Sequence, residues 1–359
     1  MTIYLLMVVL ACIVWQYVYG NQDRISEIEF KKRKKNGCII LALACILVAA
    51  LRGSTVGTDT ASYIRDYKLN EMYSYEKWYD LYDLNPGYFF LSKFFFDIGC
   101  SVQVWFGFVA FLYVGSVTKL IYRFSQNIGL SYIMFVTLGF YSFSLAGLKQ
   151  TVAMAIVLYS FNYLYDSKYI RFFACVGLAT FFHYTSLIFA FVFIIAIMKK
   201  NKFIYLFLTV GFAIVVFNMR SIFGAAVDVL DQEHYRMYLS SDYKYSPTTF
   251  VVLAAVLLIS FVYLKTYRDV DYKESVMMYS IMYLGVITQL FSFVVASAFR
   301  LAMYFSVFSV ILWPNAVSTE KDSTARGYMQ LGSAFAFVLY YIYINRDGGS
   351  TVPYLFYWE

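Results

Sequence analysis

Residues 275–318 read SVMMYSIMYLGVITQLFSFVVASAFRLAMYFSVFSVILWPNAVS and carry a single charged residue, Arg300, in 44 positions. A helix needs about 20 mostly apolar residues to cross the hydrocarbon core of a bilayer, so this stretch predicts two crossings that meet near Arg300. Similar runs recur along the 359-residue chain, which is 61% hydrophobic and only 14% charged. In soluble domains about a quarter of the residues are charged. The sequence therefore predicts an all-α, polytopic membrane protein.

The apolar runs predict about 12 transmembrane helices, with a range of 10 to 12 because some neighbouring runs are short for one crossing each. We expect residues 1–359 to form a single integral membrane domain with two longer outer loops, at about 53–101 and 220–247. A helix near 87–99 is predicted to lie at the membrane surface. The predicted crossings are 2–19, 38–52, 102–121, 130–146, 149–165, 170–182, 184–198, 203–219, 248–267, 275–297, 301–317 and 327–344.

The Lys and Arg residues predict the orientation, because cytoplasmic loops carry most of the positive charge. The loop after the first run holds Arg24 and the KKRKK cluster at 31–35, and it is therefore placed inside. Following the loops in alternation puts 18 of the 29 Lys and Arg at the cytoplasmic side and both termini outside. The KKRKK cluster is interpreted as an anchor to membrane lipids rather than as a nucleic-acid site.

Motifs for metals, cofactors and nucleotides are missing from the sequence. The 5 cysteines are scattered and the 2 histidines lie far apart, so neither type forms a zinc motif. There is no P-loop and no HExxH. The sequence Asp269-Val270-Asp271 matches the DxD of soluble glycosyltransferases, but it lies in a short inner loop without a nucleotide-binding domain. We expect no metal, no cofactor and no nucleic-acid partner, and we expect the chemistry at the outer face, where the long loops lie.

Three basic residues lie at the outer ends of predicted crossings. Arg52 is followed directly by Gly53 and then by Gly57. Lys149 follows a break between two apolar runs, and Arg300 interrupts the stretch quoted above. Each has a structural alternative, which is an Arg that snorkels at a helix end or a Lys at the interface. An Arg inside hydrocarbon costs about 2.5–3.5 kcal/mol on insertion scales, so it normally faces a cavity or an anionic partner.

Further candidates at the same face are His183 and the basic residues Arg220 and Arg236 of the second outer loop. Their alternatives are a packed histidine among aromatic residues and a solvated loop of mixed charge. Guanidinium groups bind phosphate oxygens in pairs, so these converging cations suit a lipid diphosphate. Cations at a diphosphate leaving group stabilise its developing charge without a metal. A carboxylate or imidazole would accept the proton from an attacking sugar hydroxyl.

Six sequence blocks occur in an order that resembles a known family. They are Arg-x4-Gly-Thr-Asp-Thr-x2-Tyr at 52–63, Asn-Pro-Gly-Tyr at 85–88, Gly-Leu-Lys-Gln at 147–150, Phe-His-Tyr-Thr-Ser at 182–186, Arg-Leu-Ala-Met-Tyr-Phe at 300–305 and Val-Pro-Tyr at 352–354. Over the whole chain they resemble the EpsG family of Wzy-type bacterial polysaccharide polymerases. The first block together with the late RxxxY element is fairly specific, whereas the others are weak alone. Lys149 departs from the family pattern, which usually reads Arg-Gln; a Lys keeps the charge but loses the forked donor.

The resemblance implies an enzyme, a membrane glycosyltransferase with an architecture like that of the GT-C glycosyltransferases. Its implied reaction joins undecaprenyl-diphosphate-linked oligosaccharide repeat units at the outer face of the bacterial cytoplasmic (inner) membrane. The product would be an O-antigen, a capsule or an exopolysaccharide. The implied partners are the lipid-linked oligosaccharide, membrane lipids and a chain-length regulator protein.

On this resemblance, Arg52 and Arg300 are predicted to clamp the diphosphate, and Asp59 or His183 is predicted to be the catalytic base. Supporting contacts to the diphosphate are predicted for Lys149, Tyr304, Arg220 and Arg236. Two other functions remain open at this point, a transporter or flippase of the lipid-linked unit and a ligase that uses the same lipid donor. Transporters usually show internal repeats, and no repeat is evident in this sequence.

Overall fold

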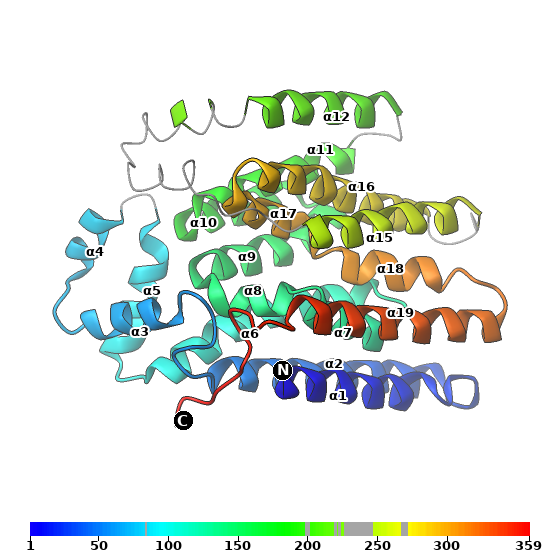
Figure 1. Cartoon of the computed structure of the whole chain (residues 1–359), viewed down its shortest axis with the longest axis horizontal. Coiled ribbons are helices and arrows are strands. Elements are labelled where there is room, and N and C mark those ends of the chain that lie inside the picture. Colours follow the sequence, from blue (N-terminus) through cyan, green and yellow to red (C-terminus); the bar gives the residue numbers. More distant parts are fainter. Residues whose placement is uncertain (83–84, 198–201, 219–220, 222–223, 226–246, 267–271) are drawn as a thin grey trace. The chain divides into compact units, whose positions relative to one another are not determined.

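The computed structural model describes residues 1–82, 85–197, 202–218, 221, 224–225, 247–266 and 272–359 (Figure 1). Within these residues the chain forms 17 α-helices, and its only β pairing consists of two isolated bridges. The predicted all-α class is therefore confirmed. The chain divides into two compact units, residues 1–190 with 320–359 and residues 191–319, and each is described by itself.

The first unit contains most of the helices and both termini. Its long helices pack in a series in which α2 contacts α6, α6 contacts α9, and α9 contacts α10, while α1 contacts α2 and α7, and α7 contacts α19. The bounds are α1 (Thr2–Tyr19), η1 (Gln22–Arg24), α2 (Glu27–Ala50), α3 (Thr60–Leu69), α4 (Tyr75–Leu81), α5 (Pro86–Asp97), α6 (Val102–Phe124), α7 (Ile128–Thr137), α8 (Phe140–Ala146), α9 (Leu148–Tyr165), α10 (Tyr169–Phe182), η2 (Tyr184–Ala190) and α19 (Ser323–Ile344).

The long helices begin at polar residues that cap them. The side chains of Ser26, Ser101 and Asn127 each accept a hydrogen bond from a backbone N–H three residues further on. Such caps satisfy N–H groups that have no partner inside the helix. The cap at Ser26 starts α2 at Glu27, within the predicted inner loop. The KKRKK cluster therefore lies in the same helix as the apolar run that follows it.

The second unit is built around α16, which contacts α11, α12, α15, α17 and α18. Its elements are α11 (Phe191–Ile197), α12 (Lys202–Phe217), α15 (Pro247–Thr266), α16 (Tyr272–Gln289), η4 (Leu290–Phe293), η5 (Ala296–Ala298), α17 (Phe299–Ser306) and α18 (Ser309–Val317). The quoted stretch thus forms α16 and, after two short 3₁₀ turns, α17 and α18. Most of the second predicted outer loop lies outside the described residues, with Arg220 and Arg236 in it.

Five described helices are long and apolar enough to cross a membrane, or up to seven if two bent pairs each count as one span. The protein is therefore a membrane protein, but the described helices do not reach the predicted 12 crossings. Several predicted spans are shorter or broken. The run at 130–146 is divided into α7 and α8, bent by 48°, and α10 has only 14 residues. At 1.5 Å per residue, α10 is about 21 Å long, less than the roughly 30 Å of hydrocarbon.

Three short helices follow α2 and build one end of the first unit. Figure 1 shows α3, α4 and α5 together at that end, and α5 contacts α3, α4, α6 and α10. Pro86 stands in the first turn of α5, where its missing N–H has no cost. The helix lies where a surface helix near 87–99 is predicted; its position at a membrane surface stays a prediction.

Candidate functional site

Arg52 lies two residues beyond the end of α2 and is buried, with 1% of its surface exposed. Its Nη1 donates a hydrogen bond of 2.5 Å to the carbonyl of Ala49, in the last turn of α2. The guanidinium carbon lies 3.9 Å from the centre of the Phe106 ring, which is a cation–π contact. Arg52 is therefore not a snorkelling residue at a helix end, because its charged group is enclosed rather than exposed to water.

The other two nitrogens of the guanidinium, Nε and Nη2, are buried without a hydrogen-bond partner among the described residues. A buried donor left without an acceptor costs about 1–3 kcal/mol, and more when it is charged. Buried charges are normally paired, and unsatisfied ones often mark a functional group. Because Nη1 already caps α2, the unused edge of Arg52 has two donors that could hold an anionic oxygen.

Tyrosines surround Arg52. The tyrosines that interact with its charge include Tyr141, Tyr88, Tyr354 and Tyr4, which come from four different segments. The hydroxyl of Tyr141 donates to the carbonyl of Cys45 at 2.7 Å, and that of Tyr354 donates to Val48 at 2.6 Å. Burial raises the pKa of Tyr354 to about 12, and the positive charge of Arg52 opposes the rise. The hydroxyl protons of Tyr141 and Tyr354 thus point to backbone carbonyls of α2.

The loop after Arg52 is tied to α8 before it enters α3. Gly57 has φ +103°, a conformation that other residues rarely adopt, and a Cβ there would lie 2.6 Å from the carbonyl oxygen of Leu145. The hydroxyl of Thr60 donates to Val56 at 2.6 Å, and Leu145 O lies 3.3 Å from the same hydroxyl. Asp59, half-buried, stands at the residue before α3. The conformation of this loop therefore fixes Asp59 relative to Arg52.

Lys149 lies in the first turn of α9, and its ammonium lies beside a pair of stacked aromatic rings. Its Nζ is 4.2 Å from the ring centres of both Tyr82 and Phe89. These two rings stack on each other with centres 4.0 Å apart. Lys149 also attracts the carboxylates of Asp66 and Asp59 electrostatically. The predicted alternative of a solvated interfacial Lys does not describe this half-buried position, in which a cation is held against aromatic faces near two acids.

Asp66 is a further candidate residue that the sequence analysis missed. Its side chain is only 13% exposed and makes a 3.4 Å ion pair with the neighbouring Arg65. Burial raises the pKa of Asp66, and the charges of Lys149 and Arg65 oppose that rise. Asp59, Tyr63 and Asp66 are spaced four and three residues apart, so they share one face of α3. This helical spacing is the signal in the sequence that points to Asp66.

The block at Asn85 and the block around His183 meet in the structure. The side-chain oxygen of Asn85 accepts a hydrogen bond of 2.8 Å from the backbone N–H of Tyr184. His183 is the residue directly after α10. Its Nδ1 shares a hydrogen bond of 2.6 Å with the hydroxyl of Thr185, and its ring stacks on that of Tyr184. The rings of Tyr88 in α5 and Tyr63 in α3 lie 5.4 Å apart, so α5 connects the histidine block to the segment that follows Arg52.

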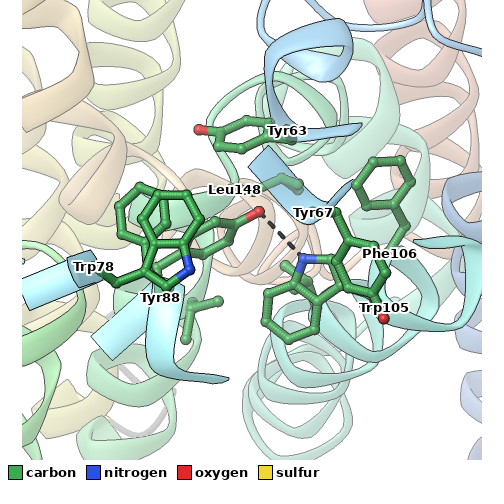
Figure 2. Close-up of a cluster of buried hydrophobic side chains, with 10 residues drawn as sticks. Tyr63, Tyr67, Trp78, Tyr88, Trp105, Phe106 and Leu148 are labelled. Atoms are coloured by element: carbon green, nitrogen blue, oxygen red, sulfur yellow. Dashed lines mark hydrogen bonds between the residues drawn. The ribbon is translucent and has the colours of Figure 1, made fainter. Parts of the chain in front are cut away.

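An aromatic cluster supports these residues from α3, α4, α5 and α6 (Figure 2). The indole N–H of Trp105 donates to the hydroxyl of Tyr88 at 3.2 Å, shown as the dashed line in Figure 2, and the rings of Tyr63 and Tyr88 lie 5.4 Å apart. Trp78 stacks at 4.4 Å on Phe89, one of the two rings that Lys149 contacts. This packing holds the faces on which the two cations lie.

Arg300 and Tyr304 belong to the second unit. Both lie on α17, where Arg300 is half-buried and Tyr304 is fully buried. The axis between α17 and α18 bends by 44°, so Arg300 stands at the start of a broken apolar segment. Because the two units are described separately, a joint site of Arg300 with Arg52 and Lys149 stays a prediction. Arg220 and Arg236 lie outside the described residues.

The comparison that decides the identity is the match of a family model. The model of the EpsG family matches residues 36–356. The chain belongs to the EpsG family. The family is Wzy-type and polymerase-like, so the chain is a membrane protein of polysaccharide biosynthesis. Comparison with curated proteins and with solved structures found no match.

All six EpsG-type blocks of the sequence fall inside the matched range. In the first unit the structure joins the blocks at 52–63, 85–88, 147–150 and 182–186 through the contacts of Arg52, Lys149 and Asn85. The block at 352–354 joins the same group through Tyr354. Within the described residues, no group of three or more His, Cys, Asp or Glu side chains is placed to hold a metal ion. The likeness to the GT-C architecture stays a prediction.

Proposed function

We propose that this EpsG-family chain is a polymerase that joins undecaprenyl-diphosphate-linked oligosaccharide repeat units by glycosyl transfer. In the proposal it is a multi-pass protein of the bacterial cytoplasmic membrane, with its site on the outer face and both termini outside. The family match supports polymerisation. The unused edge of the Arg52 guanidinium is the observation that carries the choice of a diphosphate donor.

The chemistry of that edge favours a diphosphate. Nε and Nη2 point their hydrogens in the same direction, and this side of a guanidinium binds two oxygens of one phosphate at once. The surroundings of Arg52 exclude water, so its attraction to an anion is stronger than at the surface. Nη1 remains bonded to Ala49, so the group is already oriented before a ligand arrives. Preorganised donors of this kind stabilise charge that develops during a reaction.

The reaction follows from these groups. A hydroxyl oxygen of the acceptor sugar attacks the anomeric carbon of the donor, and the bond between that carbon and the diphosphate oxygen breaks. The electron pair leaves with undecaprenyl diphosphate, whose negative charge Arg52 and Arg300 stabilise. The hydroxyl proton passes to Asp59 or His183. Lys149 adds positive charge, and Tyr304, Arg220 and Arg236 are proposed as further contacts to the donor.

The experiment incubates the purified protein in detergent with a synthetic undecaprenyl-diphosphate-linked repeat unit of the producing cell and separates the products on a gel. The proposal expects a ladder of repeat lengths and release of undecaprenyl diphosphate. An Arg123→Gln variant is the matched control, because Arg123 is bonded to Asp166 far from Arg52 in the sequence and has no place in the proposed site. A substrate that stays unchanged but crosses the bilayer of reconstituted vesicles would support a flippase and reject the polymerase.

The orientation has its own test. Thr58 is exposed in the loop after Arg52, so a cysteine placed there is open to reagents. Cys100 must first be replaced, because it is partly exposed at the end of the same predicted outer loop and would react as well. The proposal expects Thr58→Cys to react with a membrane-impermeant thiol reagent added outside intact cells. Labelling that requires lysis would place the loop on the cytoplasmic side and reject the proposed outer site.

A further inference from the structure

The last residues of the chain, 348–359, run back along the loop that carries Arg52; we name them the C-terminal strap. Figure 1 shows the C terminus beside the connection from α2 to α3. The N–H of Gly53 donates to the carbonyl of Leu355 at 2.8 Å, and the N–H of Tyr357 donates to that of Leu51 at 3.0 Å. These two bonds form an antiparallel bridge between Arg52 and Phe356. The strap is therefore bonded to the backbone on both sides of Arg52.

The strap also holds the far end of the loop and the neighbouring helix. The N–H of Gly57 donates to Ser350 at 2.6 Å, and the hydroxyl of Tyr4 in α1 donates to the carbonyl of Thr351 at 3.1 Å. Gly53 and Gly57 are both buried, so their N–H groups would have no water to replace these acceptors. Without the strap, the backbone of the loop would leave buried donors unsatisfied or change its conformation.

Tyr354 connects the strap to the helix end that Arg52 caps. Its hydroxyl donates to Val48 at 2.6 Å, next to Ala49, which accepts from Arg52. The last carbonyls of a helix lack partners within it, so both side chains satisfy groups at the same helix end. Tyr354 also interacts with the charge of Arg52. The strap and the guanidinium are thus anchored to the same turn of α2.

Close packing at Gly53 makes the contact specific. A Cβ at Gly53 would lie 2.9 Å from the carbonyl oxygen of Phe356, closer than real Cβ contacts allow. The neighbouring atom is backbone, so it cannot swing away as a flexible side chain would. Any larger residue at position 53 would push the strap away from Arg52.

We propose that the C-terminal strap is a positioning element that fixes Arg52 so that its Nε and Nη2 edge meets the diphosphate of the lipid donor. The inference rests on the proposed function, and it gives a role to the Val-Pro-Tyr block at 352–354. Displacement of a binding group by about 1 Å lowers rates by as much as 100-fold. A segment from the end of the chain thereby sets the geometry of a residue about 300 positions earlier.

The test compares Tyr354→Phe with Tyr357→Phe. Phe at 354 removes the hydroxyl that bonds Val48, whereas the exposed Tyr357 makes no side-chain hydrogen bond among the described residues and serves as the matched control. Two quantities are measured in detergent, hydrogen–deuterium exchange of the 51–60 peptide and binding of radiolabelled undecaprenyl diphosphate against undecaprenyl monophosphate. The ratio of the two affinities measures how well the Nε and Nη2 edge of Arg52 binds the diphosphate. A general loss of stability would weaken the binding of both lipids and leave this ratio unchanged.

Tyr354→Phe is expected to speed exchange of residues 51–60 by about 2- to 13-fold, the range set by one lost hydrogen bond. It is also expected to lower the preference for diphosphate over monophosphate by about threefold or more, since the edge is no longer held in register. Tyr357→Phe is expected to match the wild type in both. A second pair, Gly53→Ala against Gly332→Ala in open space on α19, repeats the comparison without touching a side chain of the strap.

Exchange and preference that both stay at the wild-type level in Tyr354→Phe and in Gly53→Ala would overturn the strap's role. Faster exchange with an unchanged preference would also overturn it, because the strap would then hold the loop without positioning Arg52. If the wild-type protein binds neither lipid, the proposed function fails instead. In that case the exchange comparison still decides whether the strap holds the loop, and unchanged exchange would reject it.

Discussion

Replacing Arg52 with Met separates a role in binding from a role in holding the fold together. Met has a similar length and no charge, so it fills much of the same buried space. The change removes the hydrogen bond from Nη1 to Ala49, worth about 1.5–3 kcal/mol for a charged donor, and the contact with Phe106, worth about 2 kcal/mol when buried. The loss is therefore about 3.5–5 kcal/mol.

The same substitution relieves a cost. Nε and Nη2 are buried without partners in the described structure, at about 1–3 kcal/mol each, or about 2–6 kcal/mol together. Replacing a buried charge by an apolar residue is often neutral or stabilising for this reason. The two sums nearly cancel, so Arg52→Met is expected to change the free energy of unfolding by less than about 3 kcal/mol while it abolishes polymerisation.

Two measurements on the same preparation check this. Tryptophan fluorescence gives the thermal unfolding midpoint in detergent, and the gel assay measures the amount of polymer. Tyr141→Phe is the stability control, since it removes one buried hydrogen bond, to Cys45, and is expected to cost about 0.5–1.5 kcal/mol. A midpoint for Arg52→Met far below that control, with polymer lost only in proportion to unfolded protein, would make Arg52 a structural cap. Full polymer from folded Arg52→Met would remove the proposed clamp.

Three other changes test the remaining parts of the site. Arg300→Ala is expected to abolish polymer while the protein still inserts into membranes, measured by its amount in the membrane fraction; full polymer would remove the second clamp. Lys149→Arg is expected to keep polymer formation, because it retains the charge and adds a fork, whereas Lys149→Met is expected to lower it at least about tenfold in the gel assay; equal activity of the two would show that the charge at this position is unimportant. Asp66 has a pKa raised by burial, so in the wild type its contribution to stability is complete at pH below the unfolded value of about 3.9 and is lost as pH rises through the higher folded value. Asp66→Asn is therefore expected to flatten that fall in the unfolding midpoint, and an identical pH profile in both proteins would contradict the burial of the carboxylate.

Much of the fold class follows from the sequence because the solvent is a bilayer. Apolar runs of about 20 residues in a lipid environment have to form helices, since every backbone group needs an internal partner. The number of crossings is less accessible. The run at 130–146 contains no charge, yet it breaks into α7 and α8, and hydropathy does not report a break.

The site shows the same division. Arg52, Lys149 and His183 are visible in the sequence as polar exceptions beside apolar runs. The burial of Arg52 is not, because Phe106 and Tyr354 close around it from segments about 50 and 300 residues away. The helical spacing of Asp66 from Asp59 is visible in the sequence, but its burial and its interaction with Lys149 are not. Residue type therefore identifies the candidate site residues, and packing against distant segments decides whether they are buried.

The most direct measurement is an experimental structure of the chain with undecaprenyl diphosphate bound. The account predicts that Nε and Nη2 of Arg52 lie about 2.7–2.9 Å from two oxygens of the diphosphate, the distance of a charge-assisted pair, while Nη1 keeps its bond to Ala49. A diphosphate held elsewhere, with both nitrogens of Arg52 still buried and without an acceptor, would contradict it.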